Sequence, residues 1–165
     1  MKNKISVLAV ILLAGAIVSS ASSAEGSYPQ TTGFVRIANS SPYAVYYEIT
    51  TSSSGFVIQG NKGTIPGHMS WPVQVAAITI LSPQTTGEIK IEASTHENLS
   101  CIGRTTPCFY VSMICSLNRR SVHGYYSVYC SKPSIEGSDI SVSAQSKNTA
   151  TDGYSIIPTL IIFPR

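Results

Sequence analysis

The sequence lacks any segment with a helical pattern of apolar residues. Nowhere do apolar side chains recur at spacings of three and four over a helix length, while Ser, Thr, Gly, Pro and β-branched residues are frequent throughout. This absence excludes a helical domain. Aspartate is also scarce, because only Asp139 and Asp152 are present, and a calcium loop of the usual spacing needs more of them.

The sequence also has little net positive charge, and much of it lies at the N-terminus. Lys2 and Lys4 precede an apolar run at residues 5–18 and small residues up to Ala24, the pattern of a secretory signal peptide. We expect cleavage after Ala24; a retained N-terminal anchor is the alternative. Cleavage lowers the number of Lys and Arg residues by two, from 11 to 9, against 8 acidic residues. The basic field that attracts nucleic acid is therefore absent.

The expected mature chain, residues 25–165, suits one domain with a core of normal size. The signal peptide predicts a secreted, periplasmic or cell-surface protein, with no transmembrane segment in the mature chain.

The four cysteines lack the paired spacing of a metal site, since six residues separate each of the first three. In an exported chain an even number of cysteines predicts disulfides. Three connectivities are open, and we favour Cys101 with Cys108, which closes a short loop, and Cys115 with Cys130.

Short runs of alternating apolar and polar residues, separated by turn residues, predict an all-β fold. About nine or ten short strands suit a single antiparallel β-sandwich with Greek-key-like connections, stapled by the disulfides. The runs at 34–38 and 43–50 flank the turn residues 39–42, which predicts a hairpin. The run at 87–94 alternates cleanly and should have one wet face.

Three further segments carry specific expectations. Residues 71–81 place apolar side chains on both faces, so this strand is expected to bend or to change sheets. The closing run at 154–163 predicts a buried strand, with Pro158 at a bulge or on an edge because proline cannot donate to the ladder. Residues 34–43 with 65–67 resemble the opening of thaumatin-type β-sandwiches, although that family's dense set of cysteines is missing here.

The stretch 109–131 predicts a hairpin that carries its own disulfide. Both of its runs alternate, and a cysteine lies on the apolar face of each. Antiparallel pairing through these cysteines leaves residues 121–124 as a four-residue turn. The facing residues would be Cys115 and Cys130, Leu117 and Val128, and Arg120 and Tyr125.

The usual motifs of catalysis are missing. The sequence has no Gly-x-Ser-x-Gly elbow and no phosphate-binding glycine loop. Glu88 and Glu92 would lie about 13 Å apart on a strand, beyond the roughly 5–9.5 Å of a glycosidase pair, so we interpret them as flanking Lys90 in a solvated charge ladder. The histidines are interpreted as solvent-facing loop residues: His68, His96 and His123.

Tyrosine is abundant, and four of the nine tyrosines are predicted on strand faces opposite the core: Tyr46, Tyr110, Tyr125 and Tyr129. Amphipathic rings at a surface serve recognition well, although tyrosine also simply suits strands. The hairpin tip gives the one residue-level prediction of a binding site, because guanidinium groups and aromatic rings suit anionic or carbohydrate groups. Its alternative is a solvated loop that protects an edge. The predicted site consists of Arg119, Arg120, His123, Tyr125 and Tyr126.

These features do not identify a ligand. We expect an exported, non-enzymatic binding or interaction module of the surface, adhesion or host-interaction type, without a cofactor. One alternative is a secreted, membrane-active, toxin-like β protein, and another is a secreted hydrolase with a site assembled from loops. Expected partners are a glycan, a lipid head group or a protein surface, and not nucleic acid.

Overall fold

The computed structural model describes residues 32–80, 86–103, 107–120, 125–137, 140–149 and 155–165. The predicted signal peptide at 1–24 and the predicted turn at 121–124 lie outside these residues. Within them the chain forms eleven strands in two sheets and no helix. The all-β prediction is confirmed, with one strand more than the upper end of the expected range.

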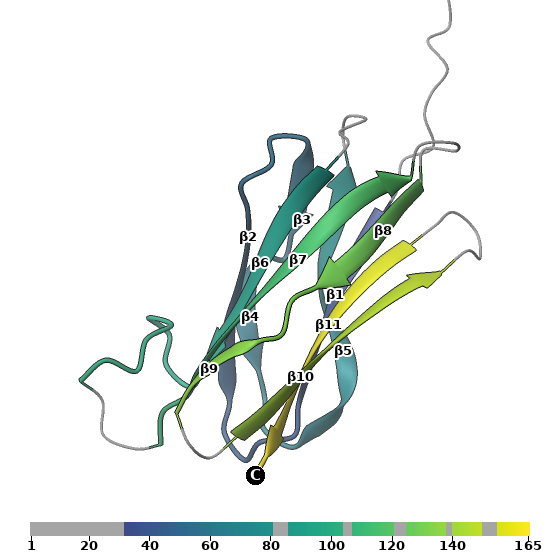
Figure 1. Ribbon diagram of the computed structural model, residues 1–165. Helices are drawn as coiled ribbons and strands as arrows, with labels where there is room; N and C mark the ends of the chain where they lie inside the picture. The colour runs from purple at the N-terminus through teal and green to yellow at the C-terminus, as the bar shows by residue number, and fades with distance from the viewer. Residues whose placement is uncertain (1–31, 81–85, 104–106, 121–124, 138–139, 150–154) are drawn as a thin grey trace, which may run out of the picture.

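The first sheet has the strand order β10-β11-β1-β5-β3 (Figure 1). Its strands are β1 (Thr32–Asn39), β3 (Phe56–Gln59), β5 (Met69–Ile80), β10 (Ile140–Thr149) and β11 (Ser155–Pro164). The second sheet has the order β4-β2-β6-β7-β8, and β9 pairs with β7. Its strands are β2 (Val45–Thr51), β4 (Lys62–Ile65), β6 (Thr86–Ser94), β7 (Tyr110–Arg120), β8 (Tyr125–Cys130) and β9 (Ser134–Glu136).

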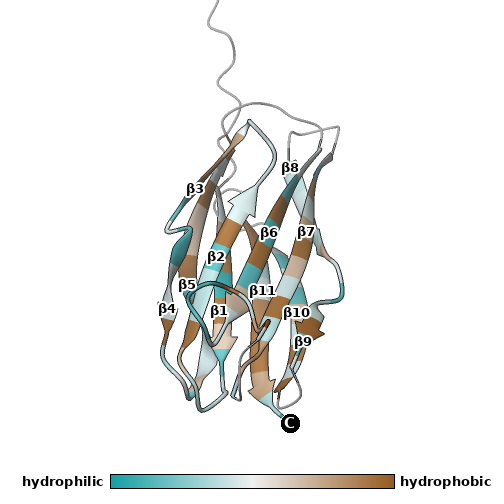
Figure 2. Ribbon diagram, turned by 90° about the vertical axis from the view of Figure 1, so that its left-hand side faces the viewer, coloured by the Kyte–Doolittle hydropathy of each residue, from teal (hydrophilic) through white to brown (hydrophobic). Residues whose placement is uncertain are grey.

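The core lies between the two sheets, because one hydrophobic cluster contains residues of both. Strand β6 shows how the sequence produces this arrangement. Ile89, Ile91 and Ala93 are fully buried on its inner face, whereas Glu88 on its outer face is exposed, and Figure 2 shows the alternation along β6 and β7. Burying one such isoleucine stabilises the fold by roughly 1.5–3 kcal/mol. The predicted wet face of this strand is confirmed.

The prediction of purely antiparallel sheets is wrong at one pair of strands. Strands β1 and β11 pair in parallel, from Gly33 with Ile156 to Asn39 with Ile162. These strands lie at opposite ends of the described chain, so neither needs a tight turn to reach the other, and a parallel arrangement costs no extra connection.

Strand β11 is buried, as predicted, but it is neither an edge strand nor bulged at its proline. It lies between β10 and β1, and its antiparallel register with β10 runs through Pro158, opposite Ser146, without a shift. The ladder with β1 is interrupted between the pairs Gly33–Ile156 and Arg36–Thr159. Pro158 lies inside this interruption, where its missing N–H leaves no ladder bond to lose.

The predicted hairpin at 34–50 is wrong, because β1 and β2 belong to different sheets. The chain crosses between the sheets around Asn39, whose fully buried side chain organises the corner. Asn39 Nδ2 donates to the carbonyl oxygens of Tyr43 at 2.8 Å and Pro66 at 3.0 Å, and Ser41 Oγ donates to Asn39 Oδ1 at 2.6 Å. A polar side chain thus satisfies backbone groups that a hairpin ladder would otherwise have paired.

Strand β5 was expected to bend or to change sheets. It stays in the first sheet along all twelve residues and pairs with both β1 and β3. Its register with β1 shifts twice, between Val35 and Arg36 and between Ile37 and Asn39. The change of sheet is therefore wrong, and the apolar residues on both faces reflect these local irregularities.

The predicted hairpin of β7 and β8 is confirmed in register. Cys115 faces Cys130, and the facing pairs continue through Leu117 with Val128 to Arg120 with Tyr125. Both predicted disulfides are present, Cys115–Cys130 within this hairpin and Cys101–Cys108 in the loop between β6 and β7.

Candidate binding site

The predicted site at the hairpin tip lies largely beyond what the structure describes. Arg119, Arg120 and Tyr125 are placed in the paired ends of β7 and β8. His123 lies outside the described residues. A contact role for these four residues therefore stays a prediction.

Tyr126 does not belong to an exposed tip. It is 6% exposed and lies on the core side of β8, where its ring meets Phe56 edge to face at a centroid distance of 6.3 Å. The cause is the alternation of the strand, which places Tyr126 with Val128 and leaves Tyr129, 72% exposed, on the outer face. The binding site predicted at the hairpin tip therefore lacks Tyr126.

The outer face of the second sheet carries a row of charged side chains across three strands. Glu48 of β2 lies opposite Glu92 of β6, an unfavourable pairing of like charges. Each carboxylate has its own ammonium partner, with Lys62 Nζ 2.9 Å from Glu48 Oε1 and Lys90 Nζ 2.7 Å from Glu92 Oε1. Tyr110 Oη also donates to Glu92. The row is therefore neutral overall, although its carboxylates face each other.

These contacts shift three pKa values. Burial would raise the pKa of Glu92, but hydrogen bonds from Lys90 and Tyr110 and the charge of Lys90 outweigh it, so this pKa is lowered. The hydrogen bond to Glu92 raises the pKa of Lys90. Burial, followed by the hydrogen bond to Glu92, raises the pKa of Tyr110. The predicted charge ladder is thus confirmed between Lys90 and Glu92, whereas Glu88 accepts a long hydrogen bond from Ser116 instead.

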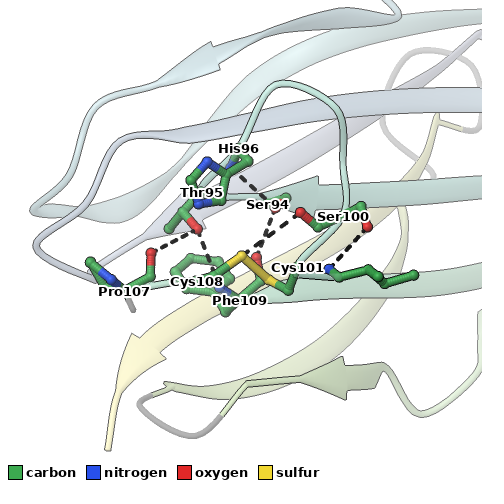
Figure 3. The surroundings of a disulfide bond; sticks show 9 residues. Ser94, Thr95, His96, Ser100, Cys101, Pro107, Cys108 and Phe109 are labelled. Carbon is green, nitrogen blue, oxygen red and sulfur yellow. Dashed lines mark hydrogen bonds between the residues drawn. A yellow bond between two sulfur atoms is a disulfide. The ribbon is translucent and has the colours of Figure 1, made fainter. Parts of the chain in front are cut away.

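The loop after β6 is fastened at both of its ends (Figure 3). Ser94 Oγ donates to the carbonyl oxygen of Phe109 at 2.8 Å and accepts from the backbone N of His96 at 3.1 Å. Thr95 Oγ1 accepts from the backbone N of Phe109 at 3.2 Å. The Cys101–Cys108 disulfide closes the loop further out. The described ends of this loop are thereby joined to each other beside the sheet.

This loop and the outer face of β2 and β4 enclose two adjoining hollows that open to solvent. We call them together the Tyr46 hollow, because Tyr46 and Glu97 line both. The first lobe has a volume of about 340 Å³ and is lined by Tyr46, Tyr47, Glu48, Lys62, Gly63, Thr64, Glu97 and Leu99. The second lobe has a volume of about 470 Å³ and is lined by Tyr46, Thr95, His96, Glu97 and Asn98.

One atom of His96, a residue that lines the second lobe, lacks a hydrogen-bond partner. Within the described ranges, His96 Nε2 is the one buried side-chain nitrogen or oxygen atom without a hydrogen bond. A buried polar atom left unsatisfied costs roughly 1–3 kcal/mol, and such atoms call for an explanation. His96 is half-buried, so the interpretation of it as a solvent-facing loop residue is wrong for its Nε2 atom, while His68 is exposed as expected.

Ser94 and His96 lie close together but are not arranged as a nucleophile and a base. The Ser94 hydroxyl is fully buried, and both of its hydrogen bonds go to backbone atoms. A catalytic serine needs its hydroxyl directed at a base and open to the substrate. Ser94 therefore does not form a nucleophile–base pair with His96. No group of three or more His, Cys, Asp or Glu residues in the described part of the chain could hold a metal ion.

Sequence reasoning found part of this site. The alternation of β2 predicted Tyr46 on the outer face, and Tyr46 is half-buried there. No sequence pattern predicts that His96 and Glu97 lie near Tyr46, because they are about fifty positions away in the chain and only the fold of the loop brings them there. The loop after β6 and the paired ends of β7 and β8 at Arg120 and Tyr125 lie at opposite ends of the second sheet (Figure 1).

The chain matches no protein-family model and none of the curated proteins compared with it. No helix in the described part of the chain is long and apolar enough to cross a membrane. The two disulfides are consistent with an oxidising, exported environment.

Proposed function

We propose that the protein is an exported β-sandwich binding module that attaches to a surface-borne ligand without chemical turnover, through the Tyr46 hollow. The observation that supports this function is the hollow itself. The half-buried Tyr46 lies among charged and hydroxyl groups of β2, β4 and the loop after β6. Hydrogen bonds and a disulfide join the ends of that loop. Preorganised polar groups around one aromatic side chain are typical of recognition sites, since little order has to be gained on binding.

The signal-peptide pattern and the disulfides support export, and the hydrogen bonds of Ser94 to backbone atoms favour binding over hydrolysis. The contact area of such a hollow is small, so a single contact should be weak and reversible. Several copies on one surface would then strengthen attachment through multivalency.

The test uses the full chain expressed with its own N-terminal segment in a secreting host and labelled with a fluorophore. Binding to a panel of intact bacterial and animal cells should saturate and should weaken in Tyr46→Ala. The matched control is Tyr129→Ala, which removes a more exposed tyrosine from the same outer face, away from the hollow. Equal binding by both variants and the unchanged protein would contradict the proposal. Dye leakage from liposomes at the same concentrations would instead support the membrane-active alternative.

A further inference from the structure

The lining of the Tyr46 hollow restricts the chemistry of its ligand, and any ligand class assigned to it rests on the binding function proposed for this hollow. Large apolar side chains contribute little to the lining, since only Leu99 and Tyr46 supply them while the Tyr47 ring packs against the core. A lipid tail or an apolar small molecule needs a mostly apolar pocket that buries most of its surface. The ligand should therefore be polar and stay partly exposed to solvent.

The charges of the hollow disfavour an anion. Glu48 and Glu97 supply two carboxylates, and Lys62 supplies one ammonium group that already lies 2.9 Å from Glu48. One carboxylate thus exceeds the positive charge, and placing like charges together costs binding free energy. A phosphate group, an anionic lipid head group or an acidic peptide fits this site poorly. The charges of the hollow are therefore compatible with a neutral or a cationic ligand.

The hydrogen-bonding groups favour a neutral ligand over a cation. Lys62 and the Asn98 amide offer donors, the Glu97 carboxylate offers acceptors, and Thr64 offers a hydroxyl group that does both. The hydrogen-bond donors of the hollow cannot bind a cationic group, and the attraction of a cation to the exposed Glu97 would be weak. A ligand with many hydroxyl groups can use the whole set, because each hydroxyl both donates and accepts.

The two lobes meet at one ring. Tyr46 and Glu97 line both lobes, so a ligand that fills both must pass along the Tyr46 side chain. Sugar rings have an apolar face of C–H groups that packs on an aromatic ring and a rim of hydroxyl groups that binds polar side chains. Two consecutive sugar units would occupy the two lobes.

From these features we propose that the Tyr46 hollow binds a neutral glycan of at least two sugar units, with one unit packed on the Tyr46 ring. The ligand class is thus an uncharged oligosaccharide or the end of a neutral polysaccharide. Sialylated and sulfated glycans are disfavoured by the excess carboxylate.

The test begins with the labelled full chain on an array of oligosaccharides, one to four units long. The array carries neutral glucose, mannose, galactose and N-acetylglucosamine oligomers, together with sialylated and sulfated glycans. Neutral oligomers should bind, and a dimer or trimer should bind about tenfold more tightly than the monomer, since only the longer ligand contacts both lobes. Binding confined to acidic glycans, or to none, overturns the inference. Equal affinity for monomer and trimer overturns the two-lobe arrangement.

Variants then locate the site by calorimetric titration with the best oligomer. Tyr46→Ala should weaken binding by about tenfold or more, because truncating an anchoring tyrosine usually costs over 1 kcal/mol. Tyr46→Phe retains the ring and should bind within about threefold of the unchanged protein. Tyr129→Ala is the matched control and should bind normally. Thermal melts and non-reducing peptide maps verify that each variant is folded with both disulfides.

The outcomes separate this inference from the proposed function. If Tyr46→Ala weakens cell attachment while no neutral glycan binds, the glycan inference is wrong and the binding function stands. If Tyr46→Ala changes neither cell attachment nor glycan binding, both are wrong. If glycan binding persists in Tyr46→Ala but is lost in the variant Arg119→Ala with Arg120→Ala, the hairpin tip is the site and the inference about the hollow fails.

Discussion

Replacing Asn39 with alanine should destabilise the fold far more than an ordinary loop substitution. The Asn39 amide serves two well-made acceptors, the carbonyl oxygens of Tyr43 at 2.8 Å and Pro66 at 3.0 Å, and a weaker one on Ile65 at 3.4 Å. In Asn39→Ala the part-buried carbonyl groups of Tyr43 and Pro66 and the buried one of Ile65 lose this donor. Ser41 loses its acceptor as well, but its hydroxyl also approaches the Tyr43 carbonyl oxygen, at 3.3 Å, and can turn fully toward it.

The magnitude depends on the two strong hydrogen bonds. An acceptor left without its partner costs roughly 1–3 kcal/mol; Pro66 loses its donor and Tyr43 keeps only Ser41, so the substitution should lower the free energy of unfolding by about 2–3 kcal/mol. For a domain of this size that corresponds to a fall in Tm of roughly 10 °C. In urea the midpoint should move down by about 1 to 2 M without a change in slope, because the substitution alters the folded state and not the surface exposed on unfolding.

The measurement is urea unfolding followed by tryptophan fluorescence and far-ultraviolet circular dichroism, with the disulfides intact. Asn61→Ala is the matched control, because Asn61 is exposed and its backbone carbonyl, which accepts from Ile49 N, is unaffected. This control should stay within about 0.5 kcal/mol of the unchanged protein. If Asn39→Ala is no more destabilising than Asn61→Ala, the buried amide does not hold the corner between the sheets.

Three further predictions concern the second sheet. Tyr126→Ala should lower the free energy of unfolding in urea by roughly 3–5 kcal/mol, because it empties a core position against Phe56. Tyr129→Ala on the outer face should change it by less than about 0.5 kcal/mol. Similar values for the two variants would contradict the placement of these tyrosines on opposite faces. The folded-state pKa of Glu92 is lowered, so the contribution of the ionised Glu92 to stability is complete above the unfolded pKa of about 4.3 and is lost as pH falls through the folded pKa. Stability should therefore fall in acid, and Glu92→Gln should weaken this pH dependence in thermal melts. An acid profile that Glu92→Gln leaves unchanged would count against the Lys90–Glu92–Tyr110 contacts. If the side chains of Arg119 and Arg120 face solvent, the variant Arg119→Ala with Arg120→Ala should keep Tm within a degree or two, since exposed charges contribute little. It should weaken binding to cells or lipid most at low salt if the hairpin tip takes part in contact. Unchanged binding at low ionic strength would leave the tip as a solvated loop.

Much of the second sheet could be predicted from the sequence because its signals are local. The alternation of β6, β7 and β8 fixes which side chains face inward, and one pair of cysteines then fixes the register from Cys115–Cys130 to Arg120–Tyr125. The same alternation separates Tyr126 from Tyr129. Tyr126 is next to Tyr125 in sequence, but the alternation of the strand places its side chain on the opposite face from the predicted tip site.

The sequence by itself determined that the chain is all-β and where most of its strands run, and it favoured the cysteine pairing that the structure shows, since each depends on residues within a few positions or one hairpin. The partners of distant strands depended on tertiary structure. Turn residues after β1 indicate that the chain changes direction, but the hydrogen bonds of Asn39 to a segment 27 residues away decide that it crosses to the other sheet. The parallel pairing of β1 with β11 and the meeting of Tyr46 with Glu97 also join segments that are far apart in the chain. Such contacts form because two faces pack best against each other in the whole fold, and no local pattern encodes that choice.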